Sequence, residues 1–332
     1  MLIAGVDRPW SFSRVGGTVS AERATDRVSL TEADGSRSVP AGSGAVGQHV
    51  ELDAVMAKAA GENFPVAFRL LPRELRRHLE AIYGYARLVD DLGDEYPGDR
   101  SAALDWVDLE LDALFAGSPR HPVFRRLLPM VDSFGVPRRP FDQLLAANRL
   151  DQHKTRYETR QELLDYCDLS ANPVGHMVLA VFESTTPERL AASDAVCSGL
   201  QILEHLQDVA EDARAGRVYL PAEDMARFGC SIEDLSAPEA GTGLRELVAY
   251  ESGFARELVE EGFPLVRSLT AYARLAISGF VAGGLAGLDA IEKAGFEVLG
   301  GTRRAGRSGI LRRFIPVYLG RRRRGDRAKA SS

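Results

Sequence analysis

Two pairs of aspartates are the residues of this chain best suited to do chemistry. Asp90 and Asp94 lie in YARLVDDLGDE, and Asp208 and Asp212 lie in LQDVAEDA. Residues four apart on an α-helix share a face, with Cβ atoms about 6 Å apart, so each pair places like charges side by side. Mg²⁺ prefers oxygen ligands and is often held by one or two carboxylates together with substrate phosphates. The spacing therefore predicts a Mg²⁺ and diphosphate site between two facing acidic helices.

The surroundings of the aspartates favour a binding site over an ordinary charged surface. No lysine or arginine stands four residues from a member of either pair, where it would relieve the repulsion. Glu204 adds a third acid to the second stripe. Two solvated helix faces that carry ordinary surface acids are the alternative that the sequence leaves open.

Apolar residues recur at helical spacing over most of the chain. Leu75, Leu79, Ile82, Ala86 and Val89 form one such stripe, which is typical of an amphipathic helix. Further helices are predicted near residues 101–115, 138–150, 161–182, 187–214, 243–261 and 265–294. Alternating β-branched runs, which would signal strands, are missing. We therefore expect a single all-α domain over residues 49–300, between a disordered leader (1–48) and a basic, partly disordered tail (301–332).

Several function classes are disfavoured by composition. Cys167, Cys197 and Cys230 are widely spaced without a CxxC, which argues against a disulfide framework or a zinc site and favours a reducing cytoplasm. No run of 18 apolar residues is present, and the glycine-rich stretch 275–288 is expected to be a buried core helix. The formal GxGxxG at 42–47 follows proline and polar residues instead of a strand, so no nicotinamide cofactor is expected.

The C-terminal tail differs in charge from the body. Residues 303–329 contain eleven lysines or arginines and one acidic residue, in a chain whose net charge is −6. Basic residues interleaved with apolar ones, as in ILRRFIPVYL (310–319), favour peripheral contact with the anionic inner face of a membrane. A solvated tail without a partner is equally compatible with the sequence. The alternative that Arg303, Arg304 and Arg307 fold over a diphosphate is also open, and no nucleic-acid partner is expected.

Other basic and aromatic residues are weaker candidates. Arg87 precedes Asp90 by three residues, and its guanidinium group could bind a phosphate or form a structural ion pair with a carboxylate. The segment DQHKTRY (151–157) gathers Lys154 and Arg156 after a predicted helix, where they could donate to a phosphate or favour the helix dipole. Pro173 interrupts an apolar helical pattern and predicts a kink or a helix boundary.

At these residues the chain resembles the squalene/phytoene synthase family over roughly residues 51–299. The first signature is YGYARLVDDLGD (83–94), and the second runs from Gln201 to Asp212 and continues as RAGRVYLP (214–221). Between them, YCDLSANPVG (166–175) stands where the family has YxxxVAGxVG. Within the family, ENFPV (62–66), SANPVG and DQHKTRY are most similar to the hydroxysqualene synthases of bacterial hopanoid biosynthesis.

The resemblance implies an isoprenoid synthase (class I terpenoid synthase) helical bundle with a central cleft. It implies two or three Mg²⁺ ions held by Asp90, Asp94, Asp208 and Asp212, and the carboxylate of Glu204, which departs from the family, could bind a further cation. It implies a diphosphate donor in Arg87 and substrate contacts from Tyr83, Tyr166, Tyr219 and Gln201, with Tyr166 also catalytic. Lys154 and Arg156 would add phosphate donors, and Phe64, Tyr83 and Tyr166 are candidates for stabilising a carbocation, although each also suits a core position.

The substrate that the resemblance implies is presqualene diphosphate, which would ionise and be captured by water to give hydroxysqualene and pyrophosphate. Glu204 and Gln207 depart from the family, which usually has asparagine and a basic residue at these positions. A synthase that condenses two prenyl diphosphates head to head is the alternative among enzymes, and a non-catalytic assembly factor is the alternative of another class. Other enzymes of squalene biosynthesis are expected partners in either enzymatic case.

Overall fold

The computed structural model describes residues 70–301 and 304–321. Phe64, the leader, the formal dinucleotide motif and Arg303 lie outside these residues. Within them every regular element is a helix, so the predicted all-α class is confirmed. A single isolated bridge pairs Arg156 with Val218 beside the bundle.

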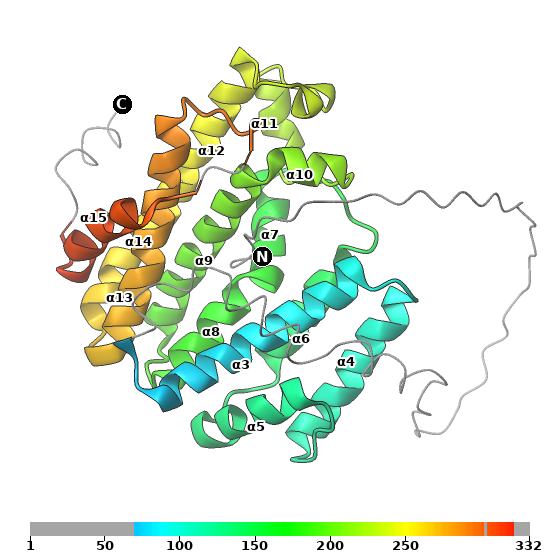
Figure 1. Ribbon diagram of the computed structural model, residues 1–332, viewed down its shortest axis with the longest axis vertical. Helices are drawn as coiled ribbons and strands as arrows, with labels where there is room; N and C mark the ends of the chain where they lie inside the picture. The colour runs from blue at the N-terminus through cyan, green and yellow to red at the C-terminus, as the bar shows by residue number, and fades with distance from the viewer. Residues whose placement is uncertain (1–69, 302–303, 322–332) are drawn as a thin grey trace, which may run out of the picture.

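The first helices of the described chain form the lower part of the molecule in Figure 1. They are α3 (Arg73–Asp90), the π-helical turn η2 (Asp91–Glu95), α4 (Arg100–Phe115), α5 (Pro122–Phe134) and α6 (Arg139–Leu150). Helix α5 was not among the predicted helices. Pro129 interrupts its pattern, although Pro122 in its first turn and left-handed Gly135 (φ 59°) at its end are ordinary boundary signals.

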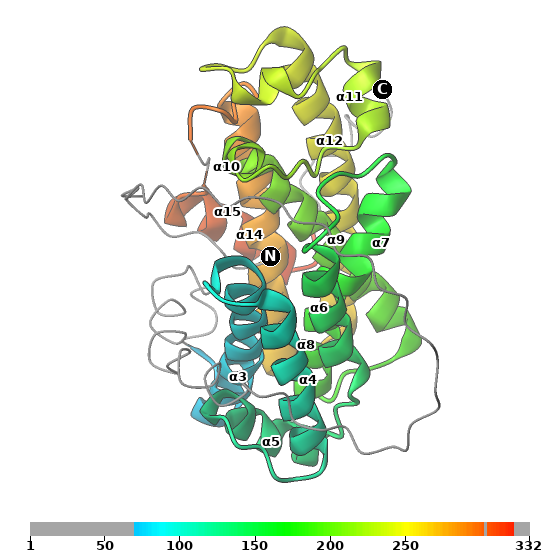
Figure 2. The ribbon, with the colours of Figure 1, turned by 90° about the vertical axis from the view of Figure 1, so that its right-hand side faces the viewer.

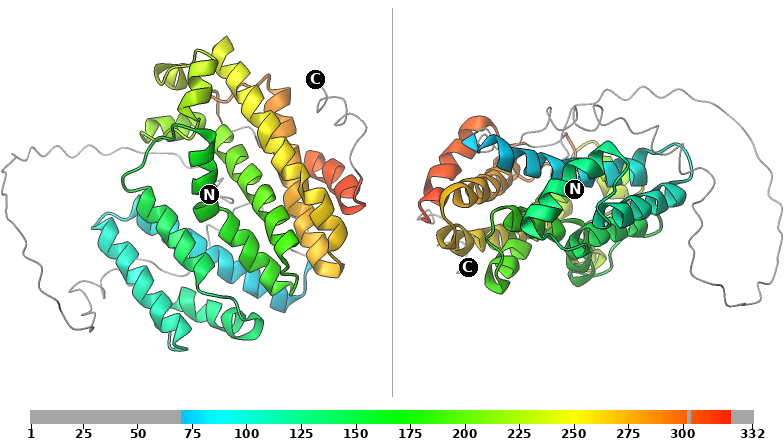
Figure 3. Two further views of the ribbon diagram at one scale, coloured as in Figure 1. Left: turned by 180° about the vertical axis from the view of Figure 1, so that it is seen from behind. Right: turned by 90° about the horizontal axis from the view of Figure 1, so that it is seen from below.

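The remaining helices surround α9. They are α7 (Arg160–Ser170), α8 (Asn172–Val181), α9 (Pro187–Gln207), α10 (Val209–Arg214), α11 (Ala222–Arg227), the 3₁₀ turn η3 (Glu233–Ser236), α12 (Thr242–Glu260), α13 (Gly262–Ser268), α14 (Ala271–Lys293) and α15 (Arg307–Tyr318). Helix α9 packs against α7, α8, α12, α13 and α14 and therefore forms the centre of the bundle (Figures 1 and 2). Seen from behind in Figure 3, the early helices, the central green helices and the yellow to orange helices follow one another across the molecule.

Two helices that carry site residues, α7 and α9, begin at capping threonines. The Thr159 hydroxyl accepts a hydrogen bond from the Glu162 amide at 3.2 Å at the start of α7. Thr186 caps α9 in the same way, and Pro187 follows in the first turn, where its missing N–H costs nothing. These caps fix the residue at which each helix begins and therefore the position of its side chains along the bundle.

Three predicted helices are interrupted in the structure. Helix α7 ends at Ser170 and α8 begins at Asn172. Pro173 therefore marks a helix boundary, which is one of the two predicted outcomes. The prediction of one helix over 187–214 is wrong, because Asp208 (φ −110°, ψ 13°) leaves the helical conformation between α9 and α10. The prediction of one helix over 265–294 is also wrong, because Leu269 is extended (ψ 157°) between α13 and α14.

The glycine-rich stretch belongs to α14 and packs inside the bundle, as predicted. A Cβ at Gly284 would meet Leu200 Cδ2 at 2.5 Å, and one at Gly287 would meet Leu203 Cδ2 at 2.8 Å. Glycine therefore lets α14 approach α9 closely. In the described chain α14 is also the one helix long and apolar enough to span a membrane, but 67% of its apolar window is buried within the protein.

Candidate active site

The first aspartate pair lies where α3 changes into a π-helical turn. Asp90 is the last residue of α3, and Asp94 lies within η2. Insertions of π-helix are uncommon and occur frequently at functional sites. The Asp94 side chain is 43% exposed, so one member of the pair is accessible from solvent while Asp90 lies deeper.

Helix α6 holds this turn in place from the side. Asn148 Nδ2 donates a hydrogen bond to Asp90 Oδ1 at 3.1 Å, and Gln152 Nε2 donates to the Gly93 carbonyl at 3.0 Å. A Cβ at Gly93 would stand 2.5 Å from Asn148 Oδ1, so this close approach requires glycine. Burial raises the pKa of Asp90 to about 8, and the hydrogen bond from Asn148 only partly opposes this effect.

The second pair lies at the junction of α9 and α10. The Asp212 amide donates to the Asp208 carbonyl at 2.8 Å, so the two residues remain one helical turn apart although α9 has ended. Burial raises the pKa of Asp212 to about 8, and the charges of Asp208 and Glu204 raise it further. Glu204 is itself buried on the last turn of α9.

Arg217 connects the two acidic pairs. Its guanidinium Nη2 lies 2.5 Å from Asp94 Oδ1, and its backbone amide donates to the Asp212 carbonyl at 2.9 Å. Its positive charge lowers the pKa of Asp212. Arg217 thus links Asp94 of the first pair to Asp212 of the second. Sequence reasoning did not single out Arg217, although it belongs to RAGRVYLP, which carried part of the family resemblance.

The residues present fit a Mg²⁺ site of the kind that a diphosphate completes. Among the described residues, no three Asp, Glu, His or Cys side chains converge as a ready metal cage. Paired carboxylates that leave most positions to water and phosphate oxygens suit Mg²⁺ nonetheless. The carboxyls of Asp90 and Asp212 are partly buried and have raised pKa values, so a nearby cation would favour their ionised forms near neutral pH, which fits the same assignment.

Two of the three predicted basic residues form ion pairs within the protein. Arg87 Nε lies 3.0 Å from Asp91 Oδ1, which matches the ion-pair alternative for this residue. Lys154 Nζ lies 2.9 Å from Glu162 Oε2 and 4.8 Å from the centre of the Tyr157 ring. Arg156 is exposed at its bridge to Val218. None of these contacts tests the predicted role toward a phosphate.

An aromatic cluster lies beside the acidic region. The Tyr157, Tyr166 and Tyr219 rings have centroids 5.4 to 5.7 Å apart, and Tyr219 stacks on His205 at 3.8 Å. The Tyr166 hydroxyl donates to Asp151 Oδ2 at 2.8 Å. Tyr166 and Tyr219 are therefore brought together as predicted, whereas His205 and Asp151 were not foreseen as site residues.

Gln201 and Tyr83 are both buried inside the helical bundle. Gln201 Nε2 lies 3.2 Å from His205 Nε2, which joins it to the aromatic cluster. Burial lowers the pKa of His205 well below its ordinary value, so this imidazole is neutral. Tyr83 is buried on α3.

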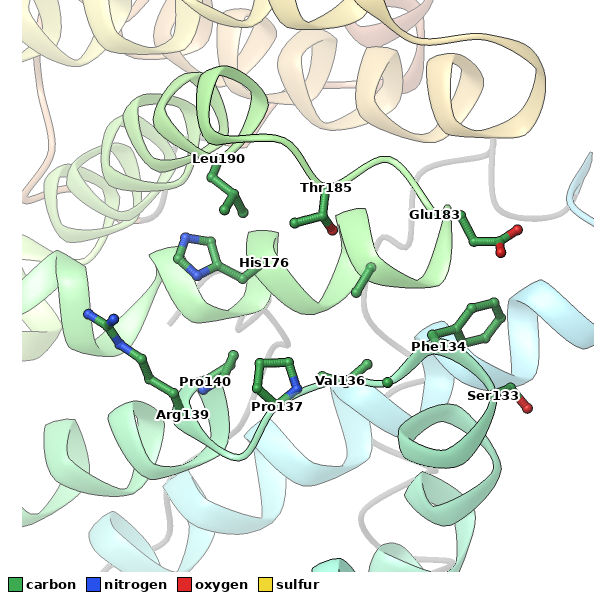
Figure 4. A pocket seen from close by; sticks show the side chains of 12 residues that line it. Ser133, Phe134, Val136, Pro137, Arg139, Pro140, His176, Glu183, Thr185 and Leu190 are labelled. Atoms are coloured by element: carbon green, nitrogen blue, oxygen red, sulfur yellow. The ribbon is translucent and has the colours of Figure 1, made fainter.

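A separate cavity of about 590 Å³ lies away from all of these residues (Figure 4). It is formed by the turn between α5 and α6, the outer part of α8 and the turn into α9, with Arg139, His176 and Leu190 among its lining residues. None of the predicted site residues lines it. The chemistry of the acidic pairs and the aromatic cluster, not cavity size, therefore identifies the candidate active site.

Comparisons with known proteins agree with this geometry. The family model described as squalene/phytoene synthase matches residues 57–310. The hydroxysqualene synthase of Rhodopseudomonas palustris is 36% identical over 213 residues, which cover 64% of this chain and 72% of the relative. The crystal structure of squalene synthase HpnC from Alicyclobacillus acidocaldarius is 37% identical, with a TM-score of 0.69 over 76% of this chain and 98% of that one. A dehydrosqualene synthase determined with a ligand is 26% identical, with a TM-score of 0.74 over 83% of this chain and 96% of that one.

Proposed function

Because the chain belongs to the squalene/phytoene synthase family, we propose that it converts presqualene diphosphate and water to hydroxysqualene and pyrophosphate. The observation that carries this proposal is that Arg217 links Asp94 of one aspartate pair to Asp212 of the other beside a largely buried aromatic cluster. Relatives named as hydroxysqualene synthase and squalene synthase support it over the other members of the family. The chain is accordingly an enzyme acting on a prenyl diphosphate.

The diphosphate group is proposed to lie against the acidic pairs. Asp90, Asp94, Asp208 and Asp212 would hold two or three Mg²⁺ ions, which would stabilise the negative charge of the departing pyrophosphate. Arg217 already lies between the pairs and can donate to a phosphate oxygen, because guanidinium groups suit that geometry. Arg87, bound to Asp91, keeps the π-helical turn in shape.

The aromatic cluster is proposed to receive the carbocation that ionisation leaves. Tyr166 is 6% exposed and His205 is 7% exposed, so bulk water has little access to this region. The faces of Tyr157, Tyr166 and Tyr219 can attract a cation. Exclusion of bulk water matters because uncontrolled capture would end the reaction at the wrong carbon. Neutral His205 suits this environment, since an imidazolium would repel the cation.

Product analysis separates this function from the head-to-head condensation of two prenyl diphosphates. The enzyme is incubated with Mg²⁺ and either farnesyl diphosphate or presqualene diphosphate, without a nicotinamide, and the lipids are analysed by mass spectrometry. We expect hydroxysqualene from presqualene diphosphate and no reaction of farnesyl diphosphate alone. Consumption of farnesyl diphosphate to presqualene diphosphate, phytoene or squalene would support the condensing synthase.

We also propose that helix α15 places the enzyme on the cytoplasmic face of a membrane. The exposed face of α15 carries Leu311 (61% exposed) and Ile315 (57%), and Leu319 (51%) directly follows the helix. Arg313 on the opposite face bonds Asp289 of α14 at 2.6 and 2.7 Å, which fixes the helix to the domain. Exposed apolar side chains among arginines suit an anionic bilayer, which attracts each nearby basic residue by about 1 kcal/mol.

Sedimentation with anionic vesicles tests this placement. The combined substitution of Leu311, Ile315 and Leu319 by serine should lower vesicle binding while the helical CD spectrum is unchanged. Ile232→Ser, at another exposed apolar site (37% exposed), is the matched control. Wild-type binding that is unaffected by the triple substitution or by added salt would rule out α15 as the membrane contact.

A further inference from the structure

Three buried polar atoms near the aromatic cluster have no hydrogen-bond partner among the described residues. They are Asp151 Oδ1, the Tyr157 hydroxyl and Gln201 Oε1. Gln201 is 0% exposed and Tyr157 is 1% exposed. Buried polar atoms are nearly always satisfied by protein or by ordered water. Their accumulation around one cluster indicates a place for small polar molecules inside an otherwise apolar region.

The contacts of these residues link them to one another. Asp151 accepts from the Tyr166 hydroxyl at 2.8 Å, and the Tyr166 and Tyr157 rings are 5.4 Å apart. Gln201 reaches the same cluster through His205, whose ring lies 6.2 Å from that of Tyr166. Asp151 directly follows α6, the helix that also supplies Asn148 to the first acidic pair. Asp151 therefore lies between the diphosphate region and the aromatic cluster.

We propose that Asp151 binds the water that captures the carbocation and accepts its proton through the carboxylate oxygen Oδ1. The C–O bond to the diphosphate breaks first, and its electron pair leaves with pyrophosphate. A lone pair of the water oxygen then forms the new C–O bond, and one O–H bond breaks with its electrons kept on oxygen. The proton goes to Asp151 and later to solvent or pyrophosphate. Asp151 serves in this way only if the proposed hydration takes place.

The other polar groups of the cluster are poorly suited to the same step. The Tyr157 and Tyr219 hydroxyls have pKa values raised above the ordinary value by burial, so they remain protonated. His205 is neutral, but its Nε2 already faces Gln201. Asp151 keeps one oxygen for Tyr166, which holds the carboxylate in place, and leaves the other available to a water.

The raised pKa of Asp151 suits a general base that works near neutral pH. Burial raises its pKa to about 6, while the hydrogen bond from Tyr166 and the charge of Arg217 lower it and the charge of Asp94 raises it. Tyr157 and Tyr219 also face Asp151. The group is therefore largely a carboxylate at pH 7 and above, and general bases with a pKa close to the working pH are effective.

The fraction of hydroxylated product tests the assignment, with presqualene diphosphate and Mg²⁺ as the probe. In Asp151→Asn, pyrophosphate release should persist, whereas the ratio of hydroxysqualene to elimination or rearrangement products should fall at least about a hundredfold, the low end of the contribution of a general base. Asp151→Glu should restore part of the ratio. Asp132→Asn, at an exposed site on α5, is the matched control and should keep the wild-type ratio.

A pH series on the wild-type enzyme gives a second readout that does not depend on a variant folding. The hydroxysqualene fraction should fall as the pH drops through about 6, where Asp151 becomes protonated. An unchanged product ratio in a folded Asp151→Asn variant, or a fraction that does not vary with pH, would overturn the role of Asp151 alone. Absence of hydroxysqualene from the wild-type reaction would overturn the proposed function as well.

Discussion

Replacing Asp90 with asparagine should make the metal-free protein more stable while it makes the enzyme nearly inactive. The Asp90 carboxyl is partly buried, and this burial raises its pKa to about 8 from 3.8. A group with a raised folded pKa stabilises the fold below its unfolded pKa, and that stability is lost as the pH rises through the folded value. Asparagine removes this penalty and can still accept the hydrogen bond from Asn148.

The size of the effect follows from the pKa shift. Each unit is worth about 1.4 kcal/mol, so a shift from 3.8 to about 8 sets a ceiling of about 6 kcal/mol for complete ionisation. Water entering the partly open region and local relaxation reduce that figure, and we expect a gain of about 2 kcal/mol near pH 9. For a domain of this size such a gain raises the melting temperature by about 4 to 8 °C.

Thermal denaturation followed by CD, in EDTA at several pH values, measures this gain. The difference between Asp90→Asn and wild type should grow from about pH 4 to pH 8 and then level off, because the carboxyl ionises near 3.8 in the unfolded chain but only near 8 in the folded protein. Added Mg²⁺ with pyrophosphate should stabilise wild type more than the variant, and turnover of the variant should fall at least about a hundredfold. The exposed Asp132→Asn serves as the control. A metal-free variant that melts at or below the wild-type temperature at every pH would refute the assignment of Asp90 as a partly buried, cation-requiring carboxylate.

Three further substitutions test neighbouring parts of the site. Asp208→Asn should lower turnover at least about a hundredfold with an unchanged helical CD spectrum, because it weakens the second acidic pair; near-normal turnover would remove Asp208 from the site. Glu204→Asn should keep activity and lower the Mg²⁺ concentration needed, since Glu204 raises the pKa of Asp212; a titration that shows complete inactivity would contradict this. Gly93→Ala should cost about 1–3 kcal/mol in urea unfolding and reduce turnover, because its Cβ would meet Asn148 Oδ1 at 2.5 Å; a neutral result would mean that the turn adjusts freely.

The helical class followed from apolar periodicity, but helix ends depended on tertiary contacts. The stripe that begins at Leu75 was enough to predict α3, and the buried positions of α14 matched its composition. The breaks at Asp208 and Leu269 carry no proline or glycine. Their local signal is limited to Asp208 and Thr270, residue types that are common at helix N-caps and that begin α10 and α14. Helix α5 was missed because Pro129 conceals a helix that packing against α3 stabilises.

The acidic pairs could be predicted because like charges one turn apart are unfavourable without a partner. The basic residue that pairs with them could not be predicted from the sequence. The contact between Arg217 and Asp94 joins residues 123 positions apart, and no local pattern encodes such a separation. The same holds for Asn148 and Asp90, which are 58 positions apart. Arg87 is a different case, because its ion pair with Asp91 has the ordinary i,i+4 spacing of a helix, and the sequence left this pairing open beside a phosphate contact.

Incorporation of labelled water tests the central claim most directly. Presqualene diphosphate and Mg²⁺ are supplied to the enzyme in water enriched in oxygen-18, and the products are analysed by mass spectrometry. The proposed hydration predicts hydroxysqualene whose hydroxyl oxygen carries the label. A hydrocarbon as the sole product, or hydroxysqualene whose oxygen is unlabelled, would contradict it.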